Sequence, residues 1–342
     1  MSAKVALPIL AEAKVQGNDV AIVAEGRATT ICEESGLVLL IRGTDELQQF
    51  GHSQVSQVLN DYVPDVLLIG LSAPINWELE FAQVARGFKV PVVAIEDIWG
   101  GLTRLNGFVP DLALVMDSLA KRLAESYKRV LNCEIIGDIA STIKPVIPEN
   151  KLGEAGRMRT LHDEGKKIIL IVGDHTQNVL EIVDLVTASV RLEPNPSNFV
   201  VTHSLVHPKL VGTPEGDAIL EPATRLLKGL RVEQFGGLST DARAARAHYT
   251  ATCFSTPLRI ALHHGQRAIS VMGPISKALL KKETGTHSYP LAASGVVPAL
   301  IEPSMFDAFL WSAHDRLRRN WIEESRFQPA KAIAAISRFI ES

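Results

Sequence analysis

The feature that most constrains the fold is an alternation of apolar runs with helical segments, which occurs in both halves of the chain. In the first half, DVLLIG (65–70) and PVVAIE (91–96) have the composition of strands buried on both faces. In the second half, KKIILIVG (166–173) and NFVVTHS (198–204) repeat this pattern. Because alternating strands and helices are joined by right-handed crossovers, each half is expected to contain a parallel sheet.

A proline-containing segment separates the two halves. Residues 143–156, IKPVIPENKLGEAG, have mixed charge and no periodicity, as is typical of a linker. The 342 residues also exceed what one hydrophobic core usually holds. We therefore predict an N-terminal domain over 1–147, a C-terminal domain over 148–315 and a helical tail over 316–342.

Composition excludes several classes of function. The net charge of −3 gives no general attraction to nucleic acid, and no uncharged apolar run is long enough to span a membrane. The three cysteines, Cys32, Cys133 and Cys253, are isolated and odd in number, which favours buried thiols in a reducing compartment. The N-terminus is a poor signal peptide. We expect a cytoplasmic protein without nucleic-acid or membrane partners, and a homo-oligomer is compatible with the sequence.

The stretch from His248 to Pro274 is predicted to form a strand, a helix and a second strand. Ser255 or Thr256 would begin the helix and Gly265 would end it. A helix N-terminus that follows a strand presents free backbone N–H groups, which favour an anion such as phosphate. An ordinary β-α-β unit with a well-capped helix explains the same residues. Gly273, at the end of the second strand, belongs to the same candidate site.

A second candidate contact follows the strand 166–173. Gly173 would allow close approach of a ligand, and His175 and Thr176 open the next helix at the strand edge where open α/β sheets bind ligands. Asp174 would repel an anion, but it could cap the helix or accept a hydrogen bond from a sugar hydroxyl.

Two histidines follow the next strand. His203 and His207 have the i, i+4 spacing of a metal pair, but Pro208 and the strand context do not place them on one helix face. We predict no metal site and consider a pocket role near the ligand. Histidine at 263 and 264 fits the end of a helix.

Polar residues also follow two strands of the N-terminal half, at the edge that would face a cleft. Asp97 or Glu78 could act as a general base toward an acceptor hydroxyl, and Trp99 could stack on a sugar. Alternatively, Asp97 caps a helix or pairs with Arg104, and Trp99 packs between the domains. The whole group is Ser72, Asn76, Glu78, Glu80, Asp97, Trp99 and Arg104.

The order of these segments resembles the GT-B fold of nucleotide-sugar glycosyltransferases and non-hydrolysing UDP-N-acetylglucosamine 2-epimerases. The resemblance is carried by segments 7–26, 70–105, 171–176, 201–208 and 234–271. It implies two Rossmann-like, doubly wound α/β domains with a C-terminal helical tail. It also implies that the Ser255–Thr256 helix end holds the donor diphosphate and that a His-Pro loop lies nearby.

Two positions depart from this pattern. The family's first strand should precede the first helix, where only Met1 and Ser2 stand. We expect this strand to be absent or external, or else to be formed by VALPIL (5–10). Many members also carry an acidic residue on the donor helix to bind ribose, whereas Ile260 stands at that position.

We therefore predict metal-independent transfer of a sugar from a nucleotide-sugar donor of the UDP type to a sugar or glycan acceptor, with no bound cofactor. The alternatives are a non-catalytic binding or assembly subunit, which Ile260 and the short N-terminus favour, and a UDP-sugar 2-epimerase. The chain contains no GxSxG, P-loop or GxGxxG motif.

Overall fold

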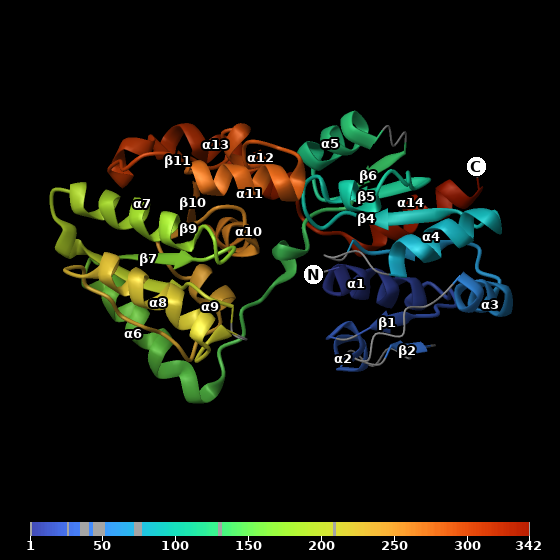
Figure 1. Cartoon of the computed structure of the whole chain (residues 1–342), viewed down its shortest axis with the longest axis horizontal. Helices are drawn as coiled ribbons and strands as arrows, with labels where there is room; N and C mark the ends of the chain where they lie inside the picture. Colours follow the sequence, from blue (N-terminus) through green and yellow to red (C-terminus); the bar gives the residue numbers. More distant parts are fainter. Residues whose placement is uncertain are drawn as a thin grey trace. The chain divides into compact units, whose positions relative to one another are not determined.

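The computed structural model describes residues 2–25, 27–34, 41–43, 52–71, 77–128, 132–207 and 210–341. The chain divides into two compact units (Figure 1). The first unit contains residues 1–139 and 324–342, and the second contains residues 140–323. The tail predicted over 316–342 is thus divided between the two units.

The first unit is an alternation of strands and helices that ends with a helix from the far end of the chain. Its elements are α1 (Ser2–Val15), β1 (Val23–Glu25), α2 (Arg27–Glu34), β2 (Ile41–Gly43), α3 (His52–Tyr62), β3 (Leu67–Ile69), α4 (Trp77–Gly87), β4 (Val92–Ile95), the 3-10 helix Gly101–Leu105, β5 (Leu112–Val115), α5 (Ser118–Lys128), β6 (Cys133–Ile135) and α14 (Pro329–Glu341).

The strands of the first unit form two separate parallel sheets. One has the order β3-β4-β5-β6 and the other pairs β1 with β2. Among the described residues, neither β1 nor β3 has a second partner strand. Residues 5–10 lie in α1, so they do not supply the first strand that the resemblance implies. In the described part of the chain, β1 and β3 therefore lie at the edges of two separate sheets.

The core of the first unit follows from the two-residue period of its strands. Val93 and Ile95 of β4 face α1 and α14, where they meet Ile9 and Ile333. The alternate strand positions face α4 and α5, which bury Phe81 and several alanines. α1 also contacts a smaller apolar cluster around β1 and α2, so this helix packs on both sheets.

The second unit has one five-stranded parallel sheet of order β11-β10-β9-β7-β8. Its elements are α6 (Leu152–Asp163), β7 (Lys167–Val172), α7 (Val179–Leu192), β8 (Phe199–Ser204), α8 (Pro214–Leu227), α9 (Thr240–Ala244), β9 (Tyr249–Thr252), α10 (Thr256–His263), β10 (Arg267–Val271), α11 (Pro274–Thr284), α12 (Pro290–Ala293), β11 (Ala299–Leu300) and α13 (Trp311–Glu324).

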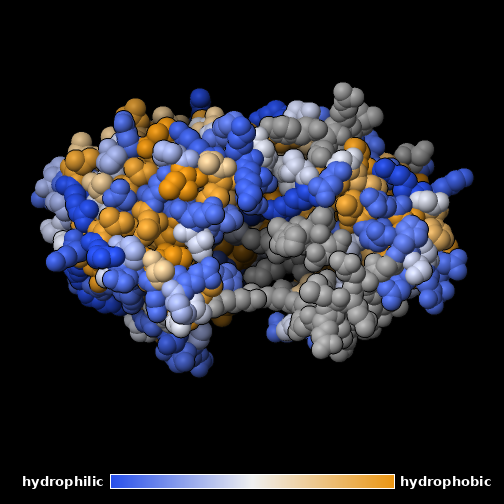
Figure 2. Space-filling model, in the orientation of Figure 1, coloured by the Kyte–Doolittle hydropathy of each residue, from blue (hydrophilic) through white to orange (hydrophobic). Residues whose placement is uncertain are grey.

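Helices cover both faces of this sheet. Ile168 and Leu170 of β7 pack with α6, α9 and α10 in one apolar cluster. α7 packs on the opposite face and against α8. Over the area of α7 and α11, hydrophobic side chains are visible among hydrophilic ones (Figure 2), and Leu180 and Ile275 are two that these helices expose.

The predicted fold class is confirmed, with local corrections. Residues 230–235, although partly apolar, contribute only an isolated bridge between Val232 and Val201. The predicted linker, 143–156, becomes regular at its end, because α6 begins at Leu152. The three cysteines are buried thiols, as predicted. No helix of the described residues is long and apolar enough to cross a membrane.

Candidate functional site

The predicted nucleotide-binding residues lie where the strands of the second unit end. Because β7 to β10 are parallel, their carboxyl ends share one edge of the sheet. The residues at or just beyond this edge are Gly173, His175, Thr176, His203, His207, Ser255, Thr256 and Gly273. This edge is the candidate nucleotide site.

The turn between β9 and α10 already holds a carboxylate from the protein itself. Asp174 Oδ2 accepts hydrogen bonds from Thr252 Oγ1 (2.7 Å), Cys253 N (2.6 Å) and Phe254 N (3.2 Å). Burial raises the pKa of Asp174 from 3.8 to about 6, although these bonds and the nearby His175 oppose the rise. The sequence predicted a turn open to a ligand. Instead, the backbone N–H groups of Cys253 and Phe254, which directly precede the N-cap residue Ser255, donate to the side chain of Asp174.

A second carboxylate occupies the start of the next helix. Glu181 Oε1 accepts from Ile275 N and Glu181 Oε2 accepts from Ser276 N, both at 2.8 Å, in the first turn of α11. Asn178 accepts from the backbone N–H of His175 and donates to Ser276 Oγ. The segment from β7 into α7 therefore binds the beginnings of two neighbouring helices.

The space beside the two glycines of the predicted site is filled by other parts of the chain. A Cβ atom on Gly173 would lie 2.2 Å from the carbonyl oxygen of Leu205. A Cβ atom on Gly273 would lie 2.3 Å from the carboxyl carbon of Glu181. The close approach predicted for a ligand at Gly173 is thus made by the backbone after β8.

The histidines of this edge differ in their environments. Burial and the positive charge of Arg243 lower the pKa of His203 to about 4, so its imidazole is neutral at pH 7. Arg243 Nη1 also donates to the His203 carbonyl at 2.7 Å. His207 is exposed, and His175 packs its ring 5.6 Å from that of Phe254. Across the described ranges, no group of three or more His, Cys, Asp or Glu residues has a metal-binding arrangement.

The face of α10 that carries Ile260 points into the core. Ile260 has no exposed surface and packs in the cluster with Ile168 and Leu170. Arg259, its neighbour, is also buried and its guanidinium lies 3.4 Å from Thr256 Oγ1. The position at which the resemblance places a ribose-binding carboxylate is therefore an apolar core position in this chain.

A second candidate site lies at the carboxyl ends of β4 and β5 in the first unit. Asp117 accepts from the indole N–H of Trp99 at 3.0 Å and from Ala120 N at 2.7 Å, so it caps α5. Trp99 is only 2% exposed. The prediction that Trp99 stacks on a sugar is wrong for this structure, because its ring is buried and its N–H is bonded.

The most perturbed group of this second site is Glu96, which sequence reasoning missed. Burial, together with the carboxylates of Asp117 and Asp97, raises the pKa of Glu96 to about 8, and the backbone N–H of Leu102 opposes the rise. Glu96 Oε1 accepts from Leu102 N at 3.2 Å. Its position directly after an apolar strand was the one available signal.

Of the two predicted base residues, only Asp97 is adjacent to Glu96 in the chain. Asp97 is buried next to Glu96, and Glu78 is half-buried in the first turn of α4. Arg104 Nη1 donates to the carbonyl oxygen of Leu71 at 3.1 Å. Ser72 and Asn76, which the sequence placed in the same cluster, lie outside the described residues.

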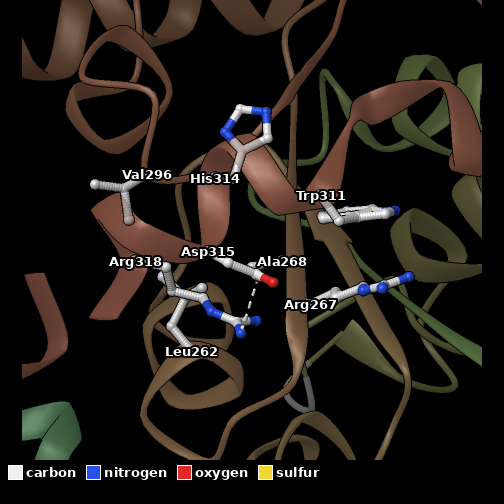
Figure 3. A pocket seen from close by; sticks show the side chains of 8 residues that line it. All are labelled: Leu262, Arg267, Ala268, Val296, Trp311, His314, Asp315 and Arg318. Carbon is white, nitrogen blue, oxygen red and sulfur yellow. Dashed lines mark ion pairs between the residues drawn. The ribbon is translucent and has the colours of Figure 1, made fainter. Parts of the chain in front are cut away.

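A small cavity of the second unit lies away from the candidate nucleotide site (Figure 3). It is at the amino end of β10, where Arg267 stacks on the Trp311 ring at 4.7 Å and Arg318 pairs with Asp315 at 3.1 Å. Its volume of about 10 Å³ is enough for one water molecule. None of the predicted site residues lines it.

No protein-family model and no curated protein matches this chain. Solved structures do match along nearly its whole length. Staphylococcus aureus MnaA with UDP is similar with a TM-score of 0.63 and 15% identity, over 99% of this chain and 94% of that one. The UDP-GlcNAc 2-epimerase of Neisseria meningitidis bound to UDP-GlcNAc has a TM-score of 0.57 and 13% identity, over 99% and 97%. A glycosyltransferase from Rickettsia africae has a TM-score of 0.58 and 8% identity, over 99% of this chain and 94% of that one.

These likenesses confirm the predicted fold. The chain has two Rossmann-like units of the GT-B type, the fold of UDP-GlcNAc 2-epimerases and GT-B glycosyltransferases. At such identities the likeness defines architecture, and function has to be argued from the residues of each site.

Proposed function

We propose that this protein binds a nucleotide sugar of the UDP type and transfers its sugar to an acceptor hydroxyl. The observation that carries the proposal is the polar carboxyl edge of a parallel sheet in each unit, in a chain whose whole fold is similar to structures solved with UDP and UDP-GlcNAc. Open α/β sheets bind ligands at this edge.

The two edges carry different chemistry, which supports a division of roles. The second unit offers the neutral His203 and the turn before α10, whose amides Asp174 holds in this structure and which would suit a phosphate once released. The first unit offers the carboxyl groups of Asp97, Glu96 and Glu78, one of which would accept the proton of the attacking hydroxyl. We assign the base role to Asp97, because Glu96 holds its own proton at pH 7.

A specific observation favours a second candidate, a GT-B protein that binds a ligand without transferring a sugar. Ile260 is buried where ribose would need an acceptor, and Asp174 is bonded to the amides of Cys253 and Phe254. Both features lower the expected affinity for a nucleoside diphosphate. This candidate predicts binding without turnover.

Nucleotide binding is expected to stabilise the second unit. UDP at about 100 times its dissociation constant would stabilise by roughly 2.7 kcal/mol and raise the melting temperature of a unit of this size by about 5–10 °C. The measurement is a thermal shift with UDP, GDP, CDP, ADP and dTDP, followed by calorimetric titration of any nucleotide that shifts it. A flat response to all five would contradict both candidates.

Transfer is expected to depend on Asp97. Asp97→Asn should lower release of UDP from a UDP-sugar by about 100-fold or more while UDP affinity stays within twofold, since a base acts on the acceptor. Asp65→Asn, an exposed carboxyl at the opposite edge of the same sheet, is the matched control and should keep full activity. UDP binding without turnover by wild type, with a panel of sugar acceptors, would favour the non-catalytic candidate.

A further inference from the structure

We propose that Asp174 is an internal anion that competes with the phosphates of a bound nucleotide for the turn between β9 and α10. The carboxylate has to leave the amides of Cys253 and Phe254 before a phosphate can bind there. Asp174 is thereby a specificity-determining residue for the site. This inference rests on the proposed function, and it adds what controls access to that site.

The geometry of the turn supports this role. Asp174 Oδ2 receives three hydrogen bonds between 2.6 and 3.2 Å, two from consecutive backbone amides, which is how loop amides hold a phosphate oxygen. The donors are fixed, because they continue from the buried strand β9. A phosphate and a carboxylate cannot share them, since both are anions.

The second oxygen shows that the carboxyl group is held at a cost. Asp174 Oδ1 is buried and, within the part of the chain that the structure describes, accepts no hydrogen bond. A buried oxygen without a hydrogen bond destabilises the folded state, and this cost is removed if the side chain moves out and the oxygen is hydrated. The carboxylate is therefore displaceable, in contrast to Glu181, whose two oxygens both accept backbone N–H groups.

The exchange is expected to follow pH. Burial raises the pKa of Asp174 to about 6. The groups that face it are His175 on its own loop and the Cys253 thiol from the turn after β9, and Glu181 from α7 faces the same thiol. Because a protonated carboxyl binds amides more weakly than a carboxylate, the turn is released as the pH falls through about 6.

Calorimetric titration with UDP and uridine tests the proposal, with wild type, Asp174→Asn and Asp184→Asn. Asp184 is an exposed carboxyl of α7 and serves as the matched control. At pH 7.5, Asp174→Asn should bind UDP at least 10-fold more tightly than wild type, and Asp184→Asn should not. Uridine, which has no phosphate, should gain less than twofold. Asp174→Ala, which vacates the turn, provides a second variant, and circular dichroism reports whether each protein is folded.

The pH dependence supplies a second readout. If only the protonated form of Asp174 admits UDP, wild type should bind about 25-fold more tightly at pH 5.5 than at pH 7.5, given a pKa of about 6. The phosphate of UDP also titrates near pH 6, so the profile of Asp174→Asn gives the contribution of the ligand alone.

The outcomes separate the two proposals. UDP binding by wild type that neither Asp174 variant improves would overturn the role of Asp174 and leave the proposed function standing. An equal gain for uridine would overturn it as well, because the effect would not concern phosphate. Absence of UDP binding by every variant at both pH values would overturn both proposals.

Discussion

Replacing Gly137 with alanine is expected to destabilise the first unit by more than about 4 kcal/mol, the range of a steric clash that the backbone cannot avoid. A Cβ atom there would lie 2.2 Å from the carbonyl oxygen of Arg326 and 2.5 Å from Cα of Phe327. That segment cannot withdraw freely, because Asp138 N donates to Ser325 O and Gln328 N donates to Ile136 O, both at 2.8 Å. Its φ of +95° adds a further cost.

Gly107→Ala is the matched control. Gly107 has nearly the same φ, +93°, but a Cβ atom there would meet nothing within 4 Å. It should therefore cost only the left-handed backbone term, about 1–2 kcal/mol. Urea unfolding followed by circular dichroism gives both values, and limited proteolysis should show the segment after Glu324 cleaved faster in Gly137→Ala. Equal costs for the two variants would contradict the tight packing at Gly137.

The Gly137 contact also explains what the sequence could not predict about the tail. The sequence predicted a helical tail, and α13 and α14 are the helices that form it. Periodicity is local, however, and it does not state which core a helix joins. α14 joins the N-terminal unit because Ile333 and Ile336 pack with Ile9 of α1, and this choice depends on contacts more than 300 positions apart.

The candidate site of the second unit illustrates the same limit. Sequence patterns placed the ends of four strands correctly, since apolar runs and helix caps are local signals. They predicted open amides before α10 because helix N-termini usually lack partners. The partner, Asp174, lies 79 residues before Cys253 in the chain, so only the sheet order β10-β9-β7 brings them together. The same sheet order places Glu181 of α7 beside Gly273, which follows β10.

The acid group of the first unit was only partly predictable. The residues after β4 include Asp97 and Trp99, which the sequence placed at the carboxyl edge of the sheet. Both lie at that edge in the structure. Whether a carboxyl group there is ionised depends on burial and on the neighbouring strand, which supplies Asp117. Sequence spacing carries no information on the burial of a carboxyl group or on which strand lies beside it. Glu96 was therefore interpreted only as the last residue of an apolar strand.

Glu96→Gln is expected to remove a large pH dependence of stability. The Glu96 carboxyl is 1% exposed, and its Oε2 atom has no hydrogen-bond partner among the residues described. Its pKa is raised from 4.5 to about 8. Between these values the folded protein keeps a proton that the unfolded chain has released, so the folded state becomes less stable as the pH rises.

The size of the effect follows from the width of this window. The contribution of Glu96 is fully present below about pH 4.5, falls by about 1.4 kcal/mol per pH unit, and is lost near pH 8, a total of about 5 kcal/mol.

Glutamine keeps the shape of the side chain and does not titrate. The free energy of unfolding of wild type minus that of Glu96→Gln should therefore decline steadily from pH 5 to pH 8 and level off at pH 9. Urea unfolding at each pH measures it, with Glu125→Gln, an exposed residue of α5, as the control that should run parallel to wild type. If wild type and Glu96→Gln also run parallel, Glu96 is ionised across the whole range, and Asp97 would then no longer be distinguished from Glu96 as the base of the first unit.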